Sequence, residues 1–147
     1  QTANSHYQKD LIKRFCKGLK VLNLGTDRLV PLIERGESGC EISKILEEEL
    51  RPFLDFKIDT LVLGCSHFQF LKKKIQKVLG KKVLILDSGG AIARQVERVL
   101  KNNNSLSVYN SPRNILLTTG RVEKFKKLSK KLLGKGFKNV SIKRISL

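Results

Sequence analysis

The sequence predicts an α/β fold in which mostly parallel sheets are flanked by helices. Along its 147 residues, apolar side chains switch repeatedly between helical spacing and short runs of strand-forming residues, so strands and helices alternate. Two of these runs, at 60–64 and 83–87, are apolar almost throughout, which is typical of parallel strands that are covered on both faces.

The first third of the chain predicts three short elements. Residues 5–15 carry one apolar stripe at helical spacing, and residues 21–24 read as a short strand. A short helix is expected at 28–34, because Pro31 is tolerated near a first turn and Gly36 favours a helix end.

The clearest amphipathic helix is expected at 38–54. Ser38 followed by Glu41 is a capping-box pair that opens it, and Pro52 predicts a break or kink near its end. The remaining elements follow in order as strand 60–64, helix 70–79, strand 83–87, helix 91–100, strand 115–119, helix 122–133 and strand 140–145. Residues 102–105 are the best linker signal.

Composition excludes several classes of protein. A hydrophobic fraction of 40% and a charged fraction of 29% are globular values, and no apolar run approaches the roughly 20 residues of a membrane span. The residues before Lys9 show neither the basic start nor the apolar stretch of a signal peptide, so nothing in them predicts export. Three cysteines without a close pair favour a reduced, cytoplasmic protein. Because the chain contains no Met and opens at Gln1, we expect a processed or truncated product.

The positive charge is large and uneven. Thirty basic against 13 acidic residues give a formal net charge of +17, and residues 112–147 hold a disproportionate share. Such a surplus attracts anions of any kind, from nucleic acid to a small dicarboxylate. The lysines of helix 122–133 are most simply a solvated face, since Phe125, Leu128, Leu132 and Leu133 recur at core spacing between them.

Chemistry is expected where the two apolar strands end, because ligands of open α/β sheets bind beyond the carboxyl ends of strands. Gly64-Cys65-Ser66-His67 follows the first strand, and Asp87-Ser88-Gly89-Gly90 follows the second. A thiol at a helix start favours the thiolate form, and a nearby histidine can exchange protons near neutrality. The alternative, that Cys65 is only a small buried hydrophobe, stays open on position alone.

Other chemistries fit the same residues less well. A metal pair of Cys65 and His67 lacks further ligands at suitable spacing, and a cysteine hydrolase would need a distant base, for which His6 is the only other histidine. The glycine spacings of phosphate loops and dinucleotide fingerprints are absent. Acid–base use of the thiol remains.

These residues resemble a known family. Leu61-Val62-Leu63-Gly64-Cys65-Ser66-His67-Phe68 is similar to the LVLGCTHY signature of glutamate racemases, within the aspartate/glutamate racemase superfamily. The segments 29–36, 86–89 and 117–120 resemble further family patterns in the same order, and Thr2 to Tyr7 does so more loosely. The resemblance extends over nearly the whole chain.

The resemblance implies a two-lobe racemase fold and cofactor-independent interconversion of L- and D-glutamate, which supplies D-glutamate for peptidoglycan. Two cysteines act on opposite faces of the substrate, and Cys65 corresponds to the second of them. Ser66 and His67 would contact the substrate, His67 would also assist proton transfer, and Glu34 matches a pocket carboxylate. No cofactor and no metal are implied.

The chain also departs from the family. Ser66 replaces the usual Thr and Phe68 the usual Tyr, which puts rate or substrate fit in doubt. The motifs of the family's first half, including the opposite cysteine, are absent. We therefore expect a C-terminal portion that is inactive alone, with 1–90 forming most of the second lobe and 91–147 a crossover helix and a segment returning to the first lobe, so that the fold is incomplete here.

Two other functions remain open. A racemase of the same superfamily acting on aspartate or a related acid would share Cys65. A basic nucleic-acid-binding protein is disfavoured, because aromatic residues make up only 6% of the chain and no recognition motif accompanies the lysines. The partners we expect are the small-molecule substrate glutamate and, as an open alternative, a second copy in a homodimer, without a membrane.

Overall fold

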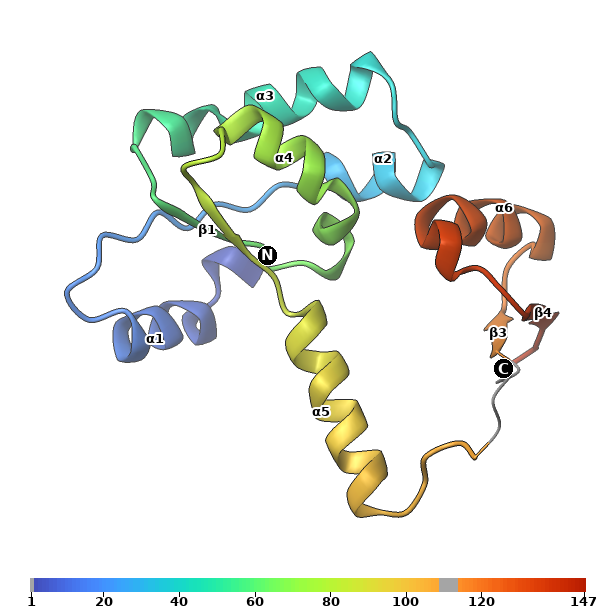
Figure 1. Cartoon of the computed structure of the whole chain (residues 1–147). Coiled ribbons are helices and arrows are strands. Elements are labelled where there is room, and N and C mark those ends of the chain that lie inside the picture. The colour runs from blue at the N-terminus through green and yellow to red at the C-terminus, as the bar shows by residue number, and fades with distance from the viewer. Residues whose placement is uncertain (1, 109–113) are drawn as a thin grey trace.

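The computed structural model describes residues 2–108 and 114–147 and has the predicted α/β character (Figure 1). Six α-helices and four strands alternate within these ranges, with three short 3₁₀ helices, η1 to η3. In chain order the elements are η1 (Thr2–Asn4), α1 (His6–Phe15), α2 (Leu29–Arg35), α3 (Cys40–Asp55), β1 (Thr60–Val62), η2 (Ser66–Leu71), α4 (Lys72–Leu79), β2 (Leu84–Leu86), α5 (Gly89–Asn102), β3 (Asn114–Thr118), α6 (Val122–Leu133), η3 (Gly134–Gly136) and β4 (Val140–Arg144).

The strands form two separate parallel pairs, which agrees with the predicted parallel sheets. β1 pairs with β2, with Leu61 opposite Ile85, and β3 pairs with β4, with Leu116 opposite Ile142. Each sheet has only two strands among the described residues, which is fewer than an independently stable sheet needs.

A single hydrophobic core lies in the segment from α2 to β2, which we call the α2–β2 body (residues 29–86). Its buried side chains come from α2, α3, α4, η2 and the two strands, and Leu32, Ile42 and Leu46 are the largest fully buried ones. α3 packs against α4, and α2 against both α3 and η2. The apolar spacing of α3 places Ile42, Leu46 and Leu50 on one buried face.

The β1–β2 sheet is covered on one face only. Leu61 and Ile85 are buried, whereas Val62, Leu84 and Leu86 on the opposite face are exposed, as expected for side chains that alternate along a strand. The expectation that both faces are covered is therefore wrong for the described chain, because no other element of it lies over the outer face deeply enough to bury these residues.

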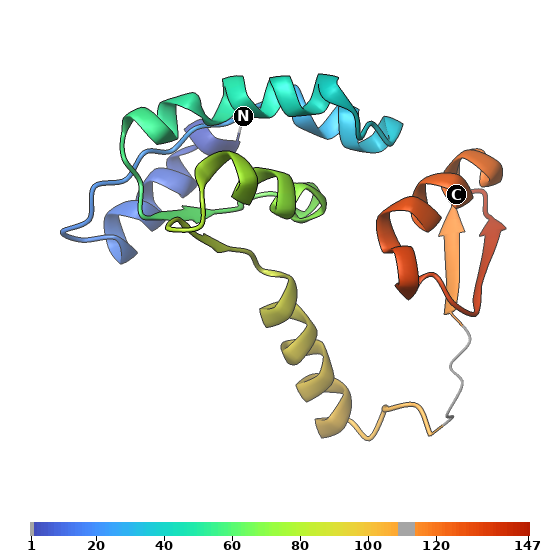
Figure 2. The same cartoon turned by 45° about the horizontal axis from the view of Figure 1, so that its top comes forward.

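The C-terminal part of the chain stands largely apart from this body. Figures 1 and 2 both show α5 running away from β2, and the β3–α6–β4 unit lying apart from α5. α5 has no buried residue. α6 contacts β4, and its Lys131 ammonium donates hydrogen bonds to the Gly36 carbonyl and to Ser38 Oγ at the end of α2.

Several local predictions need correction. Residues 21–24 form no strand, and α1 buries none of its apolar stripe, since Tyr7 and Phe15 are both exposed. Ser38 caps no helix: α3 begins after Gly39, without a side-chain cap, and the Ser38 hydroxyl accepts from Lys131 instead. α3 also continues past Pro52 to Asp55 without a break.

Candidate functional site

The carboxyl ends of β1 and β2 bring the two predicted chemical segments to one edge. Because β1 and β2 are parallel, the segments that follow them leave the sheet at the same edge. The pairing extends one residue beyond β1, since Leu63 N–H donates to the Leu86 carbonyl over 2.9 Å. Cys65 follows β1 within three residues, and Asp87 follows β2 directly. The predicted position of the site at strand ends agrees with this arrangement.

Cys65 occupies the N-cap of a 3₁₀ helix rather than of an α-helix. The helix expected at 70–79 begins earlier, as η2, and continues as α4 from Lys72. Cys65 has extended backbone angles of φ −131° and ψ 135°, and its carbonyl accepts from Phe68 N–H over 3.1 Å. This turn brings the half-buried thiol near the imidazole, with Cys65 Sγ 3.7 Å from His67 Nδ1.

The second imidazole nitrogen faces α2. His67 Nε2 lies 3.3 Å from Glu34 Oε1, a distance at which the two form an ion pair when the imidazole is protonated. The packing of α2 against η2 produces this contact between residues far apart in sequence. Glu34 and His67 side chains are 60% and 35% exposed, so the pair remains open to a small solute.

The Cys65 thiol, the His67 imidazole and the Glu34 carboxylate are therefore linked by two successive contacts, with the imidazole in the middle. A neutral imidazole that donates through Nε2 presents Nδ1 as an acceptor. In that tautomer His67 can take a proton from Cys65 while Glu34 fixes its ring. Ser66 lies between Cys65 and His67 in sequence and is exposed. The structure thus brings together Cys65, His67 and Glu34.

A second polar contact, between Lys72 and Asp87, lies at the same edge of the sheet. Lys72 Nζ donates to Asp87 Oδ2 over 2.6 Å, and Asp87 Oδ1 accepts from Gly89 N–H over 3.0 Å. The Lys72 ammonium, followed by the Gly89 N–H, lowers the pKa of the Asp87 carboxyl below its ordinary value. Sequence reasoning missed Lys72, because it is one of three consecutive lysines and nothing in the pattern distinguishes it.

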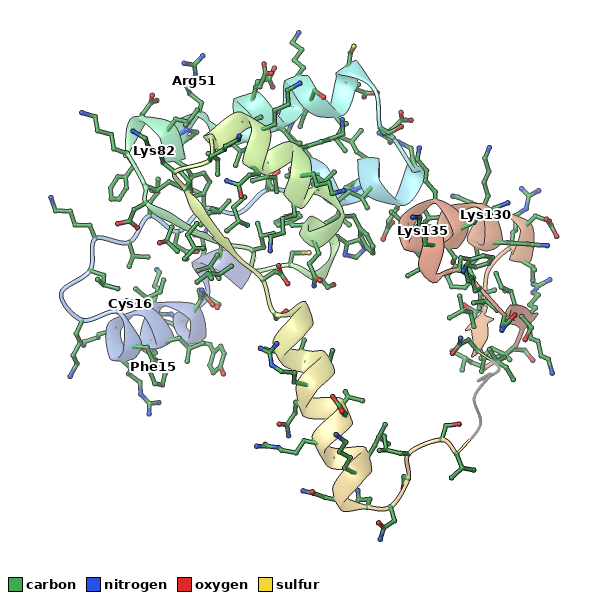
Figure 3. All side chains as sticks on the ribbon, in the orientation of Figure 1. Phe15, Cys16, Arg51, Lys82, Lys130 and Lys135 are labelled. Atoms are coloured by element: carbon green, nitrogen blue, oxygen red, sulfur yellow. The ribbon has the colours of Figure 1, made fainter. Side chains whose placement is uncertain are left out.

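The other two cysteines lie away from this edge. Cys16 is at the end of α1, as Figure 3 shows, and Cys40 is the exposed first residue of α3. Within residues 2–108 and 114–147, no group of three His, Cys, Asp or Glu side chains is placed to hold a metal ion. No helix in those ranges is long and apolar enough to cross a membrane.

The basic surface matches the prediction of a solvated face. The five lysines of α6 are exposed, while Phe125, Leu128 and Leu132 are half-buried. Leu133, expected on the same buried stripe, is 46% exposed because it lies at the last residue of the helix. Figure 3 shows two of the C-terminal lysines, Lys130 on α6 and Lys135 just after it.

Comparison with known proteins identifies relatives of the chain. No family model matches it. A glutamate racemase of Aliivibrio fischeri is 43% identical over 102 residues, which cover 69% of this chain and 39% of that protein. A glutamate racemase of Shewanella pealeana is 37% identical over 142 residues, which cover 95% of this chain and 53% of that protein.

Solved structures of glutamate racemases share the fold of this chain. The crystal structure of the Escherichia coli glutamate racemase, in complex with L-glutamate, matches with a TM-score of 0.79 and 29% identity. The match covers 99% of this chain and 55% of that one. By sequence and by fold the chain is related to part of the glutamate racemases, and it spans about half the length of the relatives that it matches.

Proposed function

We propose that the protein takes part in the interconversion of L- and D-glutamate by cofactor-independent proton transfer, with Cys65 as one of two acid/base thiols. The observation that supports this most directly is the line of Cys65, His67 and Glu34 at the carboxyl end of β1. The family and the bound L-glutamate of the E. coli relative support the substrate. Supply of D-glutamate for peptidoglycan is the proposed physiological role.

The reaction needs a base on one face of the substrate α-carbon and an acid on the other. His67 Nδ1 accepts the thiol proton, and the Cys65 thiolate then removes the α-proton, so that the C–H bond breaks and an S–H bond forms. The electron pair remains on the substrate, delocalised into its carboxylate. A thiol on the opposite face donates a proton to the α-carbon, which inverts the centre without any oxidant or reductant.

Glu34 and Ser66 complete the proposed site. The Glu34 carboxylate holds the His67 ring in place through the contact with Nε2, while the exposed Ser66 hydroxyl and His67 contact the substrate. Because glutamate is an anion, the surplus positive charge of the chain favours its approach.

The opposite thiol is proposed to come from outside residues 1–147. Cys16 ends α1 and Cys40 begins α3, so neither lies at the strand ends that carry Cys65. With one thiol, the chain alone could remove a proton but could not deliver one to the other face. We therefore expect the isolated chain to be inactive in racemisation.

The test replaces the matched part of the Shewanella pealeana racemase by this chain. The chimera is expected to racemise glutamate, followed by circular dichroism, and to incorporate deuterium at the α-carbon in D₂O. Cys65→Ser should abolish turnover in at least one direction, because a hydroxyl is a far weaker acid than a thiol. The matched control, Cys40→Ser, removes an exposed thiol far from the strand ends and should leave the rate unchanged.

Three results would contradict the proposal in distinct ways. Turnover retained in both directions by Cys65→Ser would reject Cys65 as acid/base. Racemisation by the isolated 147-residue chain would reject the need for an external thiol. Racemisation of aspartate but not of glutamate in a substrate panel would favour the sister activity within the superfamily.

A further inference from the structure

The short helix η2 carries two of the three groups of the candidate site, yet little within it fixes its own shape. Cys65 is its N-cap and His67 is its second residue. A 3₁₀ run of six residues is longer than usual, and its hydrogen bonds have poorer geometry than those of an α-helix. Among its six residues, all of them described, only Leu71 is buried. The position of the Cys65–His67 pair therefore depends on what holds η2 from outside.

The β1–β2 sheet holds the start of η2. Leu63 N–H donates to the Leu86 carbonyl over 2.9 Å, which fixes the backbone two residues before Cys65. The first turn then closes through the hydrogen bond from Phe68 N–H to the Cys65 carbonyl. This end of η2 is thus attached to both strands through the main chain.

An ion pair holds the end of η2. Lys72 follows η2 as its C-cap and is the first residue of α4, and its ammonium donates to Asp87 Oδ2 over 2.6 Å. The other carboxylate oxygen, Oδ1, accepts from Gly89 N–H over 3.0 Å. The Asp87 side chain is only 18% exposed, and hydrogen bonds to an ionised group are stronger than neutral ones. Asp87 therefore ties the end of η2 to the turn between β2 and α5 (residues 87–89).

Gln69 touches the same turn from the middle of η2. A Cβ added to Gly89 would lie 2.5 Å from Gln69 Oε1 and 3.2 Å from Asp87 Oδ1. Both side chains thus lie directly against the Gly89 backbone, where a side chain would displace them. The turn after β2 meets η2 at its middle as well as at its end.

We propose that Lys72 is a positioning residue for Cys65: its ion pair with Asp87 clamps η2 to the turn after β2 and so keeps the thiol within reach of His67. The inference deepens the proposed function and rests on it for the role of Cys65. Cys65 Sγ lies 3.7 Å from His67 Nδ1, and His67 Nε2 lies 3.3 Å from Glu34 Oε1. A shift of η2 by about 1 Å would break either contact, and misplacement of that size can cost about a hundred-fold in rate.

A direct contact of Lys72 with the substrate fits the geometry less well. Its ammonium is already engaged with the Asp87 carboxylate, and the pair carries no net charge with which to attract the glutamate anion. Loss of a residue that binds the substrate equally in the ground and transition states raises KM, whereas loss of a positioning residue lowers kcat. The two roles are therefore separable by kinetics.

Alkylation of Cys65 by iodoacetamide tests the clamp without any racemisation. Both thiols of interest lie in the full 147-residue chain, and the exposed Cys40 serves as an internal reference. Lys72→Met removes the ammonium and keeps an unbranched side chain. At about pH 7, mass spectrometry of the peptides should show Cys65 alkylated about five-fold more slowly, because the thiolate is the nucleophile and a displaced His67 no longer accepts its proton. The rate at Cys40 should not change.

A rescue variant and a neighbouring control make this test specific. Lys72→Arg keeps the charge and can still reach the Asp87 carboxylate, so it should restore the Cys65 rate to within about two-fold. Lys73→Met, at the exposed neighbouring position, should leave the rate unchanged. If Lys72→Met loses its circular dichroism spectrum, Asp87→Asn is used instead. It keeps an acceptor but no charge, and should slow Cys65 by about two-fold.

A double-mutant cycle asks whether Lys72 acts through His67. His67→Gln alone should slow alkylation of Cys65, because it removes the proton acceptor. If Lys72 acts by placing that acceptor, the double variant Lys72→Met/His67→Gln should be no slower than His67→Gln alone. A merely stabilising role of Lys72 would instead give losses that multiply.

The chimera with the Shewanella pealeana racemase supplies the kinetic test. Lys72→Met should lower kcat for glutamate about ten-fold and change KM by less than about three-fold. Unchanged kcat, a raised KM alone, unchanged alkylation of Cys65, equal slowing at Cys40 or multiplying losses in the cycle would each overturn the inference. A chimera with the unaltered chain that does not racemise glutamate would reject the proposed function, while the alkylation rates would still decide whether Lys72 positions Cys65.

Discussion

Truncation of Leu46 tests whether the α2–β2 body is held together by the face of α3 that packs on α4. Leu46 is fully buried, and Leu46→Ala removes three carbons, which cost about 2.4 kcal/mol at about 0.8 kcal/mol each. The cavity left behind raises the expected loss to about 3–5 kcal/mol. Leu54 on the same helix is 39% exposed, so Leu54→Ala should cost less than about 1.5 kcal/mol, since water fills the space.

Urea unfolding followed by far-ultraviolet circular dichroism measures both variants. At a slope of about 1–3 kcal/mol per molar urea, Leu46→Ala should lower the midpoint by about 1 M or more, with little change in slope. If this variant is already unfolded without urea, Ile42→Val, at another fully buried position, should cost about 0.5–1.5 kcal/mol. Equal losses for the Leu46 and Leu54 variants would refute the assigned core.

Two further predictions concern polar contacts. The Lys72 ammonium lowers the pKa of Asp87, so their ion pair stabilises the fold above the ordinary carboxyl pKa of 3.8, and this contribution is lost as pH falls through the lowered value. Asp87→Asn should therefore reduce the urea midpoint at about pH 6 but much less at about pH 2.5. A reduction that does not depend on pH would contradict the assignment. Lys131→Ala removes the contact with the Gly36 carbonyl and should speed amide hydrogen exchange in α6. The control Lys130→Ala, at an exposed neighbouring position, should leave that exchange rate unchanged. Equal exchange rates in both variants would show that the Lys131 contact does not hold α6 in place.

The regular elements were predictable because their patterns are local. Helix 122–133 agrees with α6, and strands 60–64 and 83–87 contain β1 and β2. The capping prediction failed for a tertiary reason. Ser38 has the residue type and spacing of a cap, yet its hydroxyl accepts from Lys131, 93 positions away, and local patterns do not reveal such a partner.

The candidate site was predictable only in part. Cys65 and His67 are two residues apart, so their proximity follows from one turn of chain. Glu34 entered only through a family resemblance, because its contact with His67 depends on α2 packing against η2. The sequence did not predict the contact of Lys72 with Asp87, because this contact depends on the parallel pairing of β1 with β2.

The failed expectation about sheet coverage bears on the proposed function. Val62, Leu84 and Leu86 give β1 and β2 the composition of strands that are buried on two faces, yet the chain buries one. Exposed apolar patches mark surfaces that contact protein, ligand or membrane, so the outer face of the β1–β2 sheet is a candidate contact surface. In the proposed mechanism, inversion at the α-carbon needs a second thiol opposite Cys65.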